Sequence, residues 1–306
     1  MKKILSFIVF LAALCSCSSE KSVYLFSYFM DNGQDGLHLA YSHDGLNWEA
    51  LNEGESFLAP EVGKDRLMRD PSIVQDENGT FHMVWTSGWW DQGIGYASST
   101  DLVNWSEQRN IPVMENFEGT RNSWAPELFY DRDSKTFYIF WSSTVPGAFP
   151  QVGTDESGLN HRQYYVTTKD FETFSETALF FEPGFSVIDG AIIKKDGTYH
   201  LFVKNETERP AEKNIRHTSN DKPYDFPTAV SDPITGDYWA EGASPLQVGD
   251  YVYVYFDKYM EGKYGAVRSK DMETWEDVSD MVAFPKGTRH GTAFKVSEKV
   301  LEGLMR

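Results

Sequence analysis

The chain has 306 residues, of which 46 are Asp or Glu and 28 are Lys or Arg, so its formal net charge is -18. This acidic balance argues against nucleic acid or an anionic membrane surface as a partner, because both attract clustered basic charge. Hydrophobic residues make up 41% of the chain and aromatic residues 15%, which is enough for a packed core and too much for a disordered chain. The length allows two average domains or one large barrel or propeller.

The N-terminus has the pattern of an export signal. Two lysines precede an apolar run over residues 4–14, which is too short to span a bilayer. Both cysteines of the chain follow directly, and residues 14–17 resemble a bacterial lipobox in which Cys17 becomes the lipidated first residue. The alternative is cleavage by an ordinary signal peptidase, with no role for either cysteine.

This pattern predicts a signal peptide over residues 1–16, a short tether over 17–22, and a single folded domain over 23–306. The protein would be an exported bacterial lipoprotein, in the periplasm or on the outer membrane or cell surface. Its only contact with a membrane would be through the lipid, and we expect a monomer. Cleavage before Cys17 leaves a folded part with no cysteine pair for a disulfide.

A short motif recurs along the rest of the chain. It consists of a hydroxyl residue, an Asp two positions later, and an aromatic residue four positions beyond that Asp. The clear copies cover residues 42–48, 99–105, 168–174 and 269–275. A weaker copy runs from Ser219 through Asp221 to Phe226. Regular recurrence of one motif predicts equivalent structural units, and each Asp is expected to accept backbone hydrogen bonds in a turn.

Upstream of each copy lies a short apolar strand, a tight turn and an aromatic-rich strand. The clearest example is residues 69–74, the turn at 76–79 and residues 80–85; its Asn-Gly pair supplies the positive φ angles of a hairpin turn. Every unit is predicted to be β. Helical spacing of apolar residues occurs only after Ser297, where one or two turns are expected.

The first and last units are incomplete in complementary ways. Residues 23–51 contain a second and a third strand with no first strand, and the chain ends soon after a lone first strand that includes residues 294–296. Joining the two fragments completes one unit, which is how a β-propeller closes its ring. We therefore predict an all-β fold, a five-bladed β-propeller closed by pairing of the N- and C-terminal strands, in preference to an immunoglobulin-like sandwich.

Residues that begin the innermost strands of a propeller converge on its axis. Alignment of the five strand starts places these residues at equivalent positions: Asp70, Ala125, Asp189, Glu241 and His290. Any one such Asp or Glu is more often a turn residue than a catalyst. Like charges gathered at one mouth cost free energy, however, unless one group is protonated or a cation or substrate is bound. The set therefore predicts a functional cavity at the axis.

These strand starts resemble the blade motifs of glycoside hydrolase family 43, in order and over the whole exported chain. The matching segments are residues 69–73, 124–127, 188–190, 241–242 and 289–292. The resemblance implies a five-bladed propeller that cleaves furanosides or xylosides with inversion. It implies that Asp70 is the general base, Asp189 orients the acid and tunes its pKa, and Glu241 is the general acid. Ala243 follows Glu241-Gly242 where the family often has Pro.

The resemblance also places His290 at the axis, near a calcium ion or a water cluster, with no cofactor required for the chemistry. An anionic Asp189 is expected to favour the protonated form of Glu241 by like-charge coupling. The arginines before Asp70 and His290 would bind sugar hydroxyls or pair with a carboxylate. The candidates for substrate binding are Arg69, Trp89, Trp90, Trp124, Glu127 and Arg289. Trp85 continues an alternating strand and is assigned to the core.

Three classes of function remain open. The first is an exo-acting inverting glycosidase on plant-type polysaccharides or oligosaccharides, with α-L-arabinofuranose as the leading sugar and a β-xyloside or galactoside as alternatives. The second is a related propeller enzyme, a fructosidase or a sialidase. It is disfavoured because the chain lacks the sequence motifs of both. The third is a lipid-anchored glycan-binding propeller without turnover. A long insertion over residues 142–161 is expected to border the pocket, with a surface excursion as the alternative.

Overall fold

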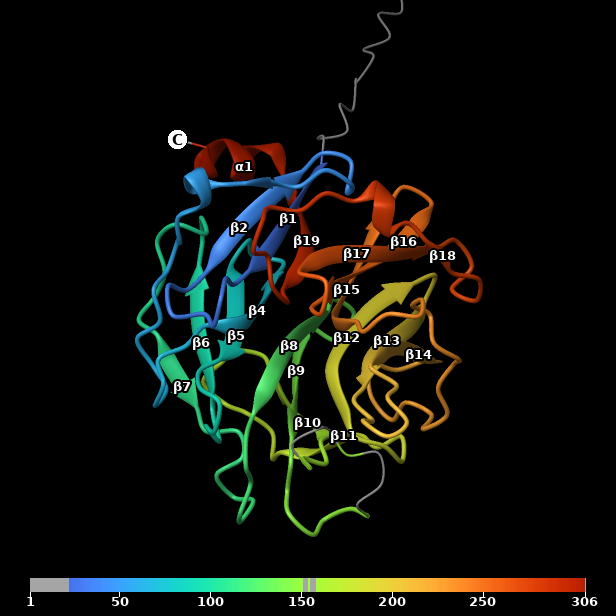
Figure 1. The fold of residues 1–306 in the computed structure, drawn as a ribbon. Coiled ribbons are helices and arrows are strands. Elements are labelled where there is room, and N and C mark those ends of the chain that lie inside the picture. The colour runs from blue at the N-terminus through green and yellow to red at the C-terminus, as the bar shows by residue number, and fades with distance from the viewer. Residues whose placement is uncertain (1–21, 151–153, 155–157, 306) are drawn as a thin grey trace, which may run out of the picture.

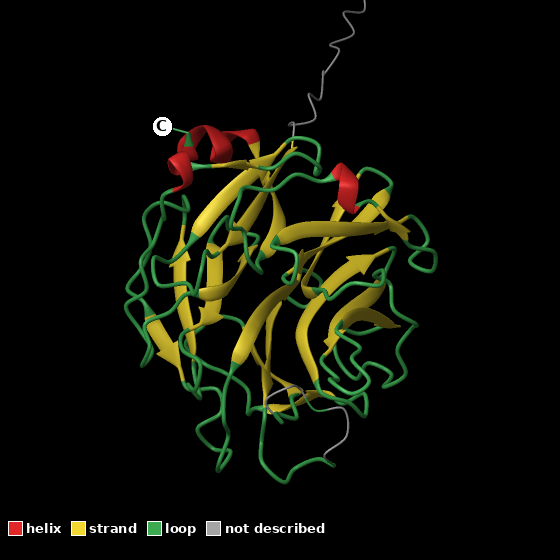
Figure 2. Cartoon of the chain, viewed as in Figure 1, coloured by secondary structure: helices red, strands yellow, loops and turns green. Residues whose placement is uncertain are grey.

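The computed structural model describes residues 22–150, 154 and 158–305. Five antiparallel sheets are arranged around one axis, and the few helical segments lie at the periphery (Figures 1 and 2). The five-bladed propeller predicted from the repeats is confirmed. The signal peptide and Cys17 lie outside the described residues. Within the described ranges, no helix has the length and apolar character needed to cross a membrane.

Each blade is a short meander of strands. The first complete blade contains β4 (Arg69–Gln75), β5 (Phe81–Thr86), β6 (Ile94–Ser99) and β7 (Arg109–Ile111). The second contains β8 (Trp124–Asp131), β9 (Thr136–Ser143), β10 (Arg162–Thr168) and β11 (Ala178–Phe181). The third contains β12 (Val187–Lys195), β13 (Thr198–Asn205) and β14 (Asn214–Asn220). The fourth contains β15 (Glu241–Val248), β16 (Tyr251–Lys258), β17 (Lys263–Ser269) and β18 (Glu276–Asp277).

The fifth blade joins the two ends of the chain, as predicted. It contains β19 (Thr292–Ser297), β1 (Ser22–Tyr28), β2 (His38–Ser42) and β3 (Glu49–Ala50). The pairing of β1 with β19 is antiparallel and runs from Ser22 opposite Ser297 to Ser27 opposite Thr292. Helix α1 (Glu298–Leu304) follows β19 at the site of the expected helical turns, and 3₁₀ turns cover Asn52–Gly54 and Ser279–Met281.

The recurring motif forms the same turn in its four clear copies. In the first, Ser42 Oγ donates to Asp44 Oδ1 at 2.9 Å, and the same oxygen accepts the backbone N–H groups of Leu46 and Asn47 at 2.7 and 2.8 Å. The Asp residues of the other clear copies also accept two backbone N–H groups. The weaker fifth copy forms a different turn, in which Asn220 Nδ2 donates to the carbonyl of Tyr224 at 2.7 Å.

The core is packed between the blades. Trp85 is fully buried, which confirms its assignment to the core. Between the fourth and fifth blades, Phe26 contacts Trp48 and Tyr255 edge to face, with ring centroids 5.6 and 6.5 Å apart. These aromatic layers hold neighbouring blades at fixed angles. The rigid ring in turn fixes the strand ends that approach the axis.

The four inner strands from β4 to β15 each begin with a bulge. The bulged residue has a positive φ in all four: Asp70 at 52°, Ala125 at 46°, Asp189 at 53° and Gly242 at 66°. The structural equivalent of Asp70 and Asp189 in the fourth blade is therefore Gly242, and the alignment at Glu241 is wrong by one residue. A glycine adopts positive φ without a Cβ clash, so here the carboxyl comes from the preceding position.

Candidate active site

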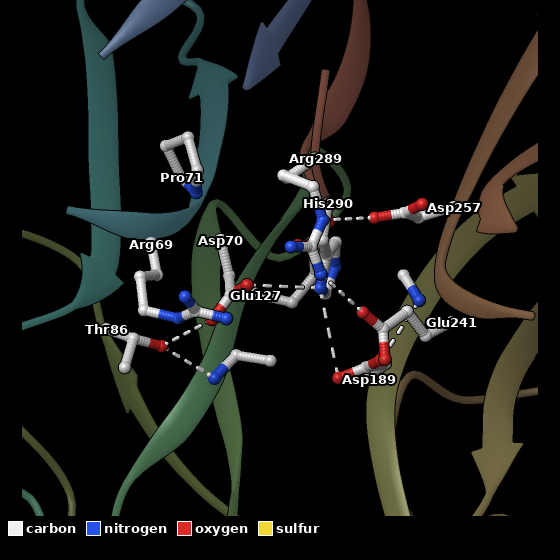
Figure 3. Close-up of polar contacts among 12 residues, drawn as sticks. Arg69, Asp70, Pro71, Thr86, Glu127, Asp189, Glu241, Asp257, Arg289 and His290 are labelled. Atoms are coloured by element: carbon white, nitrogen blue, oxygen red, sulfur yellow. Dashed lines mark hydrogen bonds and ion pairs between the residues drawn. The ribbon is translucent and has the colours of Figure 1, made fainter. Parts of the chain in front are cut away.

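A cavity of about 300 Å³ opens where the inner strands begin. Its wall contains Asp70, Asp189, Glu241 and His290, so the structure brings together the four chemically reactive residues of the predicted set. They converge from three different blades and from the segment before β19 (Figure 3). The positive-φ bulges turn Asp70 and Asp189 toward this space.

Asp70 is buried and held by two neighbours. Thr86 Oγ1 donates to its Oδ2 at 2.8 Å, and the same hydroxyl accepts the backbone N–H of Ala125 at 2.8 Å. The Nδ1 of His290 lies 3.4 Å from its Oδ1. Burial alone would raise the pKa of Asp70, but the hydrogen bond and charge of His290, together with Arg69 and Thr86, lower that pKa to about 2. Asp70 is therefore ionised and oriented to accept a proton.

His290 lies between two carboxylates, with Nδ1 3.4 Å from Asp70 and 3.9 Å from Asp189. Burial lowers its pKa, but Asp189, Asp70 and Glu127 together raise the pKa of His290 to about 9. A protonated imidazole nitrogen is no metal ligand. No group of three His, Cys, Asp or Glu side chains in the described part of the chain is arranged to hold a metal ion. The calcium ion or water cluster expected near His290 therefore remains a prediction, and no chemical step below is routed through a metal.

Asp189 lies beside the backbone of the fourth inner strand. Its Oδ2 accepts the N–H of Gly242 at 2.9 Å. Burial raises the pKa of Asp189 to about 6; His290 and Lys204 oppose this shift, and Glu241 and Asp70 add to it. Asp189 is thus the carboxyl of the pocket whose charge changes closest to neutral pH.

Both oxygens of Glu241 face cations. Lys204 Nζ donates to Oε2 at 3.0 Å, and an Arg289 NH2 group donates to Oε1 at 3.2 Å. Burial favours a raised pKa, but Lys204 first, then Arg289 and His290, outweigh burial and lower the pKa of Glu241. In the free pocket these cations outweigh the like-charge coupling with Asp189, which was expected to favour the protonated form of Glu241.

The two predicted arginines have different surroundings. Arg289 donates through Nε to Asp257 Oδ2 at 2.6 Å as well as to Glu241, which confirms the carboxylate-pairing alternative. Arg69 donates to Asn32 Oδ1 at 2.9 Å and stacks on the rings of Phe29 and Trp89, at 4.6 and 4.4 Å. Arg69 is therefore held on the pocket wall by two aromatic faces.

Two of the predicted tryptophans line the pocket. Trp89 is 38% exposed, and its ring lies edge to face with Trp124 at 5.6 Å. Trp124 Nε1 donates to the carbonyl of Trp89 at 2.7 Å, which ties the two residues together. Trp90 is 50% exposed and 6.0 Å from Trp124, but it is outside the pocket wall. The pair Trp89 and Trp124 therefore forms one aromatic side of the mouth.

Glu127 was predicted to bind substrate, but it is not part of the pocket wall. It follows the bulge of β8 and is only 9% exposed. The hydroxyl of Thr292 in the closing blade donates to its carboxyl at 3.2–3.3 Å. Burial raises the pKa of Glu127 to about 8. Glu127 is therefore a structural group beneath the pocket.

Sequence reasoning missed several residues around the pocket, among them Thr86, Lys204, Glu206 and Tyr259. They come from the ends of second strands and the loops that follow, where no repeated motif marks them. Their position in the blade could have indicated them. Lys204 pairs with Ile188, which precedes Asp189, just as Thr86 pairs with Arg69, which precedes Asp70.

None of the described residues of the insertion at 142–161 is part of the pocket wall, but His161 at its end packs against Trp124 of that wall, with ring centroids 4.9 Å apart. The insertion also contacts the loop after β13, where the N–H of Glu208 donates to the carbonyl of Thr154 at 3.0 Å.

Comparison with known proteins agrees with this geometry. A family model described as a probable glycosyl hydrolase domain, related to family 43, matches residues 20–302. An α-L-arabinofuranosidase of Bifidobacterium longum subsp. longum is 26% identical over 185 residues, which cover 54% of this chain and 17% of that protein. The chain thus spans about a sixth of that relative.

Solved structures share the fold. A thermostable family-43 glycoside hydrolase superposes with a TM-score of 0.57 at 16% identity, over 73% of this chain and 78% of that one. An α-L-arabinofuranosidase from Lactobacillus brevis superposes with a TM-score of 0.55 at 16% identity, over 69% and 72%. Because the family model covers nearly the whole chain and the pocket carries the expected carboxylates, the protein belongs to the family-43-related glycoside hydrolases.

Proposed function

We propose that this protein is an exo-acting, inverting glycoside hydrolase that releases a terminal sugar from a plant-type polysaccharide or oligosaccharide. The observation that carries the proposal is one small cavity whose wall holds carboxyl groups in unlike electrostatic surroundings. Such differences separate the roles of acid and base. A volume of about 300 Å³ is at the lower end for ligand pockets and suits a single terminal sugar.

Asp70 is assigned as the general base. Inversion requires an ionised carboxylate that takes a proton from water while that water attacks the anomeric carbon. The low pKa of Asp70 keeps it ionised, and Thr86 and His290 leave the carboxylate little freedom to rotate. Preorganisation of this kind avoids reorganisation during the reaction.

Glu241 is assigned as the general acid. It would give its proton to the glycosidic oxygen as the bond to the anomeric carbon breaks, so that one proton leaves water for Asp70 and one leaves Glu241 for the departing alcohol. Asp189 accepts the N–H of Gly242 and so fixes the backbone next to the acid. Lys204 and Arg289 favour the ionised form of Glu241, so activity is expected on the acidic side of neutral pH.

The sugar is proposed to be α-L-arabinofuranose, because the Bifidobacterium relative and the Lactobacillus structure are both named for that activity. A β-xyloside or a galactoside remains the alternative on the same fold. Trp89 and Trp124 are proposed to stack on the sugar or its aglycone, with Trp90 further out and Arg69 donating to hydroxyl groups. Sugar rings stack readily on exposed aromatic faces.

The test uses the purified domain with a panel of chromogenic furanosides and pyranosides, followed by arabinans, xylans and galactans. Asp70→Asn should lower kcat by about 10²–10⁴ on every substrate, and Glu241→Gln should do so on the polysaccharides, whose departing alcohol needs a proton. The melting temperature of both variants should stay near that of the wild type. NMR of the first product should show the inverted anomer.

Two outcomes would contradict the assignment. Near wild-type turnover of Asp70→Asn on any substrate, or of Glu241→Gln on a polysaccharide, would show that the residue has no role in the chemistry. Glycan binding with no turnover on any substrate would favour a lipid-anchored glycan-binding protein.

A further inference from the structure

A buried lysine lies beside the proposed acid. Lys204 is the penultimate residue of β13, the second strand of its blade, and its side chain is only 2% exposed. Its ammonium is shared between two carboxylates. Nζ lies 2.7 Å from Glu206 Oε2 and 3.0 Å from Glu241 Oε2. A buried ammonium is costly unless it is fully paired. The base and acid steps described above transfer no proton to or from this ammonium, so its position next to Glu241 requires an explanation.

Glu241 is clamped from two directions. Lys204 from β13 holds one oxygen, and Arg289 from the segment before β19 holds the other. Each cation has a second carboxylate partner, Glu206 for Lys204 and Asp257 for Arg289. The Glu241 carboxyl can therefore rotate only if one of these pairs breaks. Its orientation is set by charges rather than by apolar packing.

The clamp extends away from the pocket through a second buried lysine. Lys213, only 1% exposed, lies 3.0 Å from Glu206 and 3.6 Å from Glu208. Glu206 thus stands between two lysines, and only one of them also contacts Glu241. This arrangement supplies a matched pair, because Lys204 and Lys213 are equally buried and share Glu206.

Charged and titratable groups from every neighbouring element face this pair. Around Lys204 and Glu241 they are His161 before β10, Asp189 on β12, Glu206 after β13, Asp257 on β16, Tyr259 after β16, Tyr264 on β17, and Arg289 and His290 before β19. Burial lowers the pKa of Lys204, but Glu241, Glu206, Tyr259 and Asp189 raise that pKa well above its usual value. Lys204 therefore remains an ammonium throughout the working pH range.

We propose that Lys204 is a positioning residue that holds the Glu241 carboxyl toward the scissile bond and sets the pH above which this carboxyl loses its proton. The inference rests on the proposed function, because it takes Glu241 as the proton donor. Glu206 competes with Glu241 for the same ammonium. The strength of the Glu206 contact therefore controls how strongly Lys204 acts on the acid.

The first experiment measures kcat/KM against pH for the wild type and Lys204→Met on a substrate with a poor leaving group. kcat/KM reports groups of the free enzyme. Loss of an opposite charge within hydrogen-bonding distance should move the basic limb of the profile upward by about one to three pH units. Below that limb the rate should fall by roughly 10²-fold, because the carboxyl is no longer held in place.

Lys213→Met is the matched control. It removes an equally buried lysine that contacts Glu206 and Glu208 rather than Glu241. It should lower the melting temperature by a similar amount and leave the basic limb close to that of the wild type. Lys204→Arg should restore part of the lost rate. An equal shift in both methionine variants would overturn the proposal, since it would then reflect general loss of packing.

Glu206→Gln should shift the basic limb of the pH profile in the opposite direction. This variant tests the proposal even if Lys204→Met does not fold. With its competing carboxylate neutralised, Lys204 acts on Glu241 alone, so the basic limb should move to lower pH. A limb that stays in place, or moves up, would contradict the proposal.

Leaving-group dependence separates the failure of this inference from the failure of the proposed function. On an aryl glycoside whose phenol departs without protonation, Lys204→Met should approach the wild-type rate, as should Glu241→Gln. Equal slowing on good and poor leaving groups would show that Lys204 does not act through the acid. A wild-type enzyme that turns over no glycoside in the panel would refute the proposed function itself.

Discussion

At the scale of single residues, Glu127 shows how burial alone can change the charge of a carboxyl group. It lies beneath the pocket, Ser72 and Thr292 hydrogen-bond to its carboxyl, and burial nevertheless raises its pKa to about 8. Asp70, also buried, stays ionised because His290, Arg69 and Thr86 face it. The groups that neighbour each carboxyl therefore decide its charge.

This difference predicts a pH dependence of stability. Folded Glu127 keeps its proton to about pH 8, whereas an unfolded glutamate releases it near its model value of 4.5. The folded state then binds more protons between these values, so its contribution to the free energy of unfolding falls as pH rises from 5 to 8. Glu127→Gln should remove this contribution, at most about 1.4 kcal/mol per pH unit. Urea unfolding at pH 5 and pH 8 measures it, and an unchanged pH dependence in the variant would contradict the prediction.

At the scale of elements, the bulge that begins each inner strand aims the side chains of the site. In the fourth blade the bulge carries Gly242, and a Cβ added there would lie 2.5 Å from Cγ of His290. Glycine is therefore needed at position 242 for two reasons: it tolerates a φ of 66°, and it leaves room for the imidazole of His290.

Gly242→Ala should therefore displace His290 from Asp70 and Asp189 and lower kcat/KM by roughly 10²-fold. Gly249→Ala is the control, because Gly249 has a similar φ of 59° and a Cβ added there meets nothing within 4 Å. Both variants should lose about 1–2 kcal/mol of stability from backbone strain. Only the first should lose activity, as measured by steady-state kinetics beside thermal unfolding. Full activity in Gly242→Ala would mean that the position of His290 is not critical.

The repeated elements could be predicted because their physical causes are local. The turn motif uses side-chain to backbone bonds within six residues, as Asp44 and Asp101 show. The role proposed for Lys204 could not be predicted, because Glu241 lies on the next blade and its contact with Lys204 depends on the angle between the two blades. The one-residue error at Glu241 has a similar origin, since the bulge that offsets it is a property of strand pairing.

At the scale of the whole molecule, the ring is closed by six residue pairs between β1 and β19 and covered by α1. Leu301 and Leu304 of this helix are buried in the cluster that also contains Val23, Leu25 and Phe294. The helix thus covers the β1–β19 pairing at the end away from the pocket. The length of β19, roughly 20 Å, separates the helix from the pocket.

Leu301→Ala should accordingly lower the free energy of unfolding by about 2–5 kcal/mol through the cavity it leaves. The kcat/KM of the folded enzyme should not change. Glu302→Ala, an exposed position on the same helix, should leave stability within about 0.5 kcal/mol of the wild type. Urea unfolding and initial rates test both statements, and loss of activity in folded Leu301→Ala would show that the β1–β19 pairing and the pocket are coupled.

The position of the start of β1 has a consequence for the orientation of the enzyme on a cell membrane. Its first residues lie on the side of α1, while Ser27 pairs with Thr292 toward the pocket (Figure 1). The tether over residues 17–22 reaches at most about 20 Å when fully extended. If Cys17 carries the predicted lipid, the α1 side rests near the bilayer and the mouth faces outward. A polymer chain end could then enter from the surrounding medium, and the released sugar would depart away from the lipid surface.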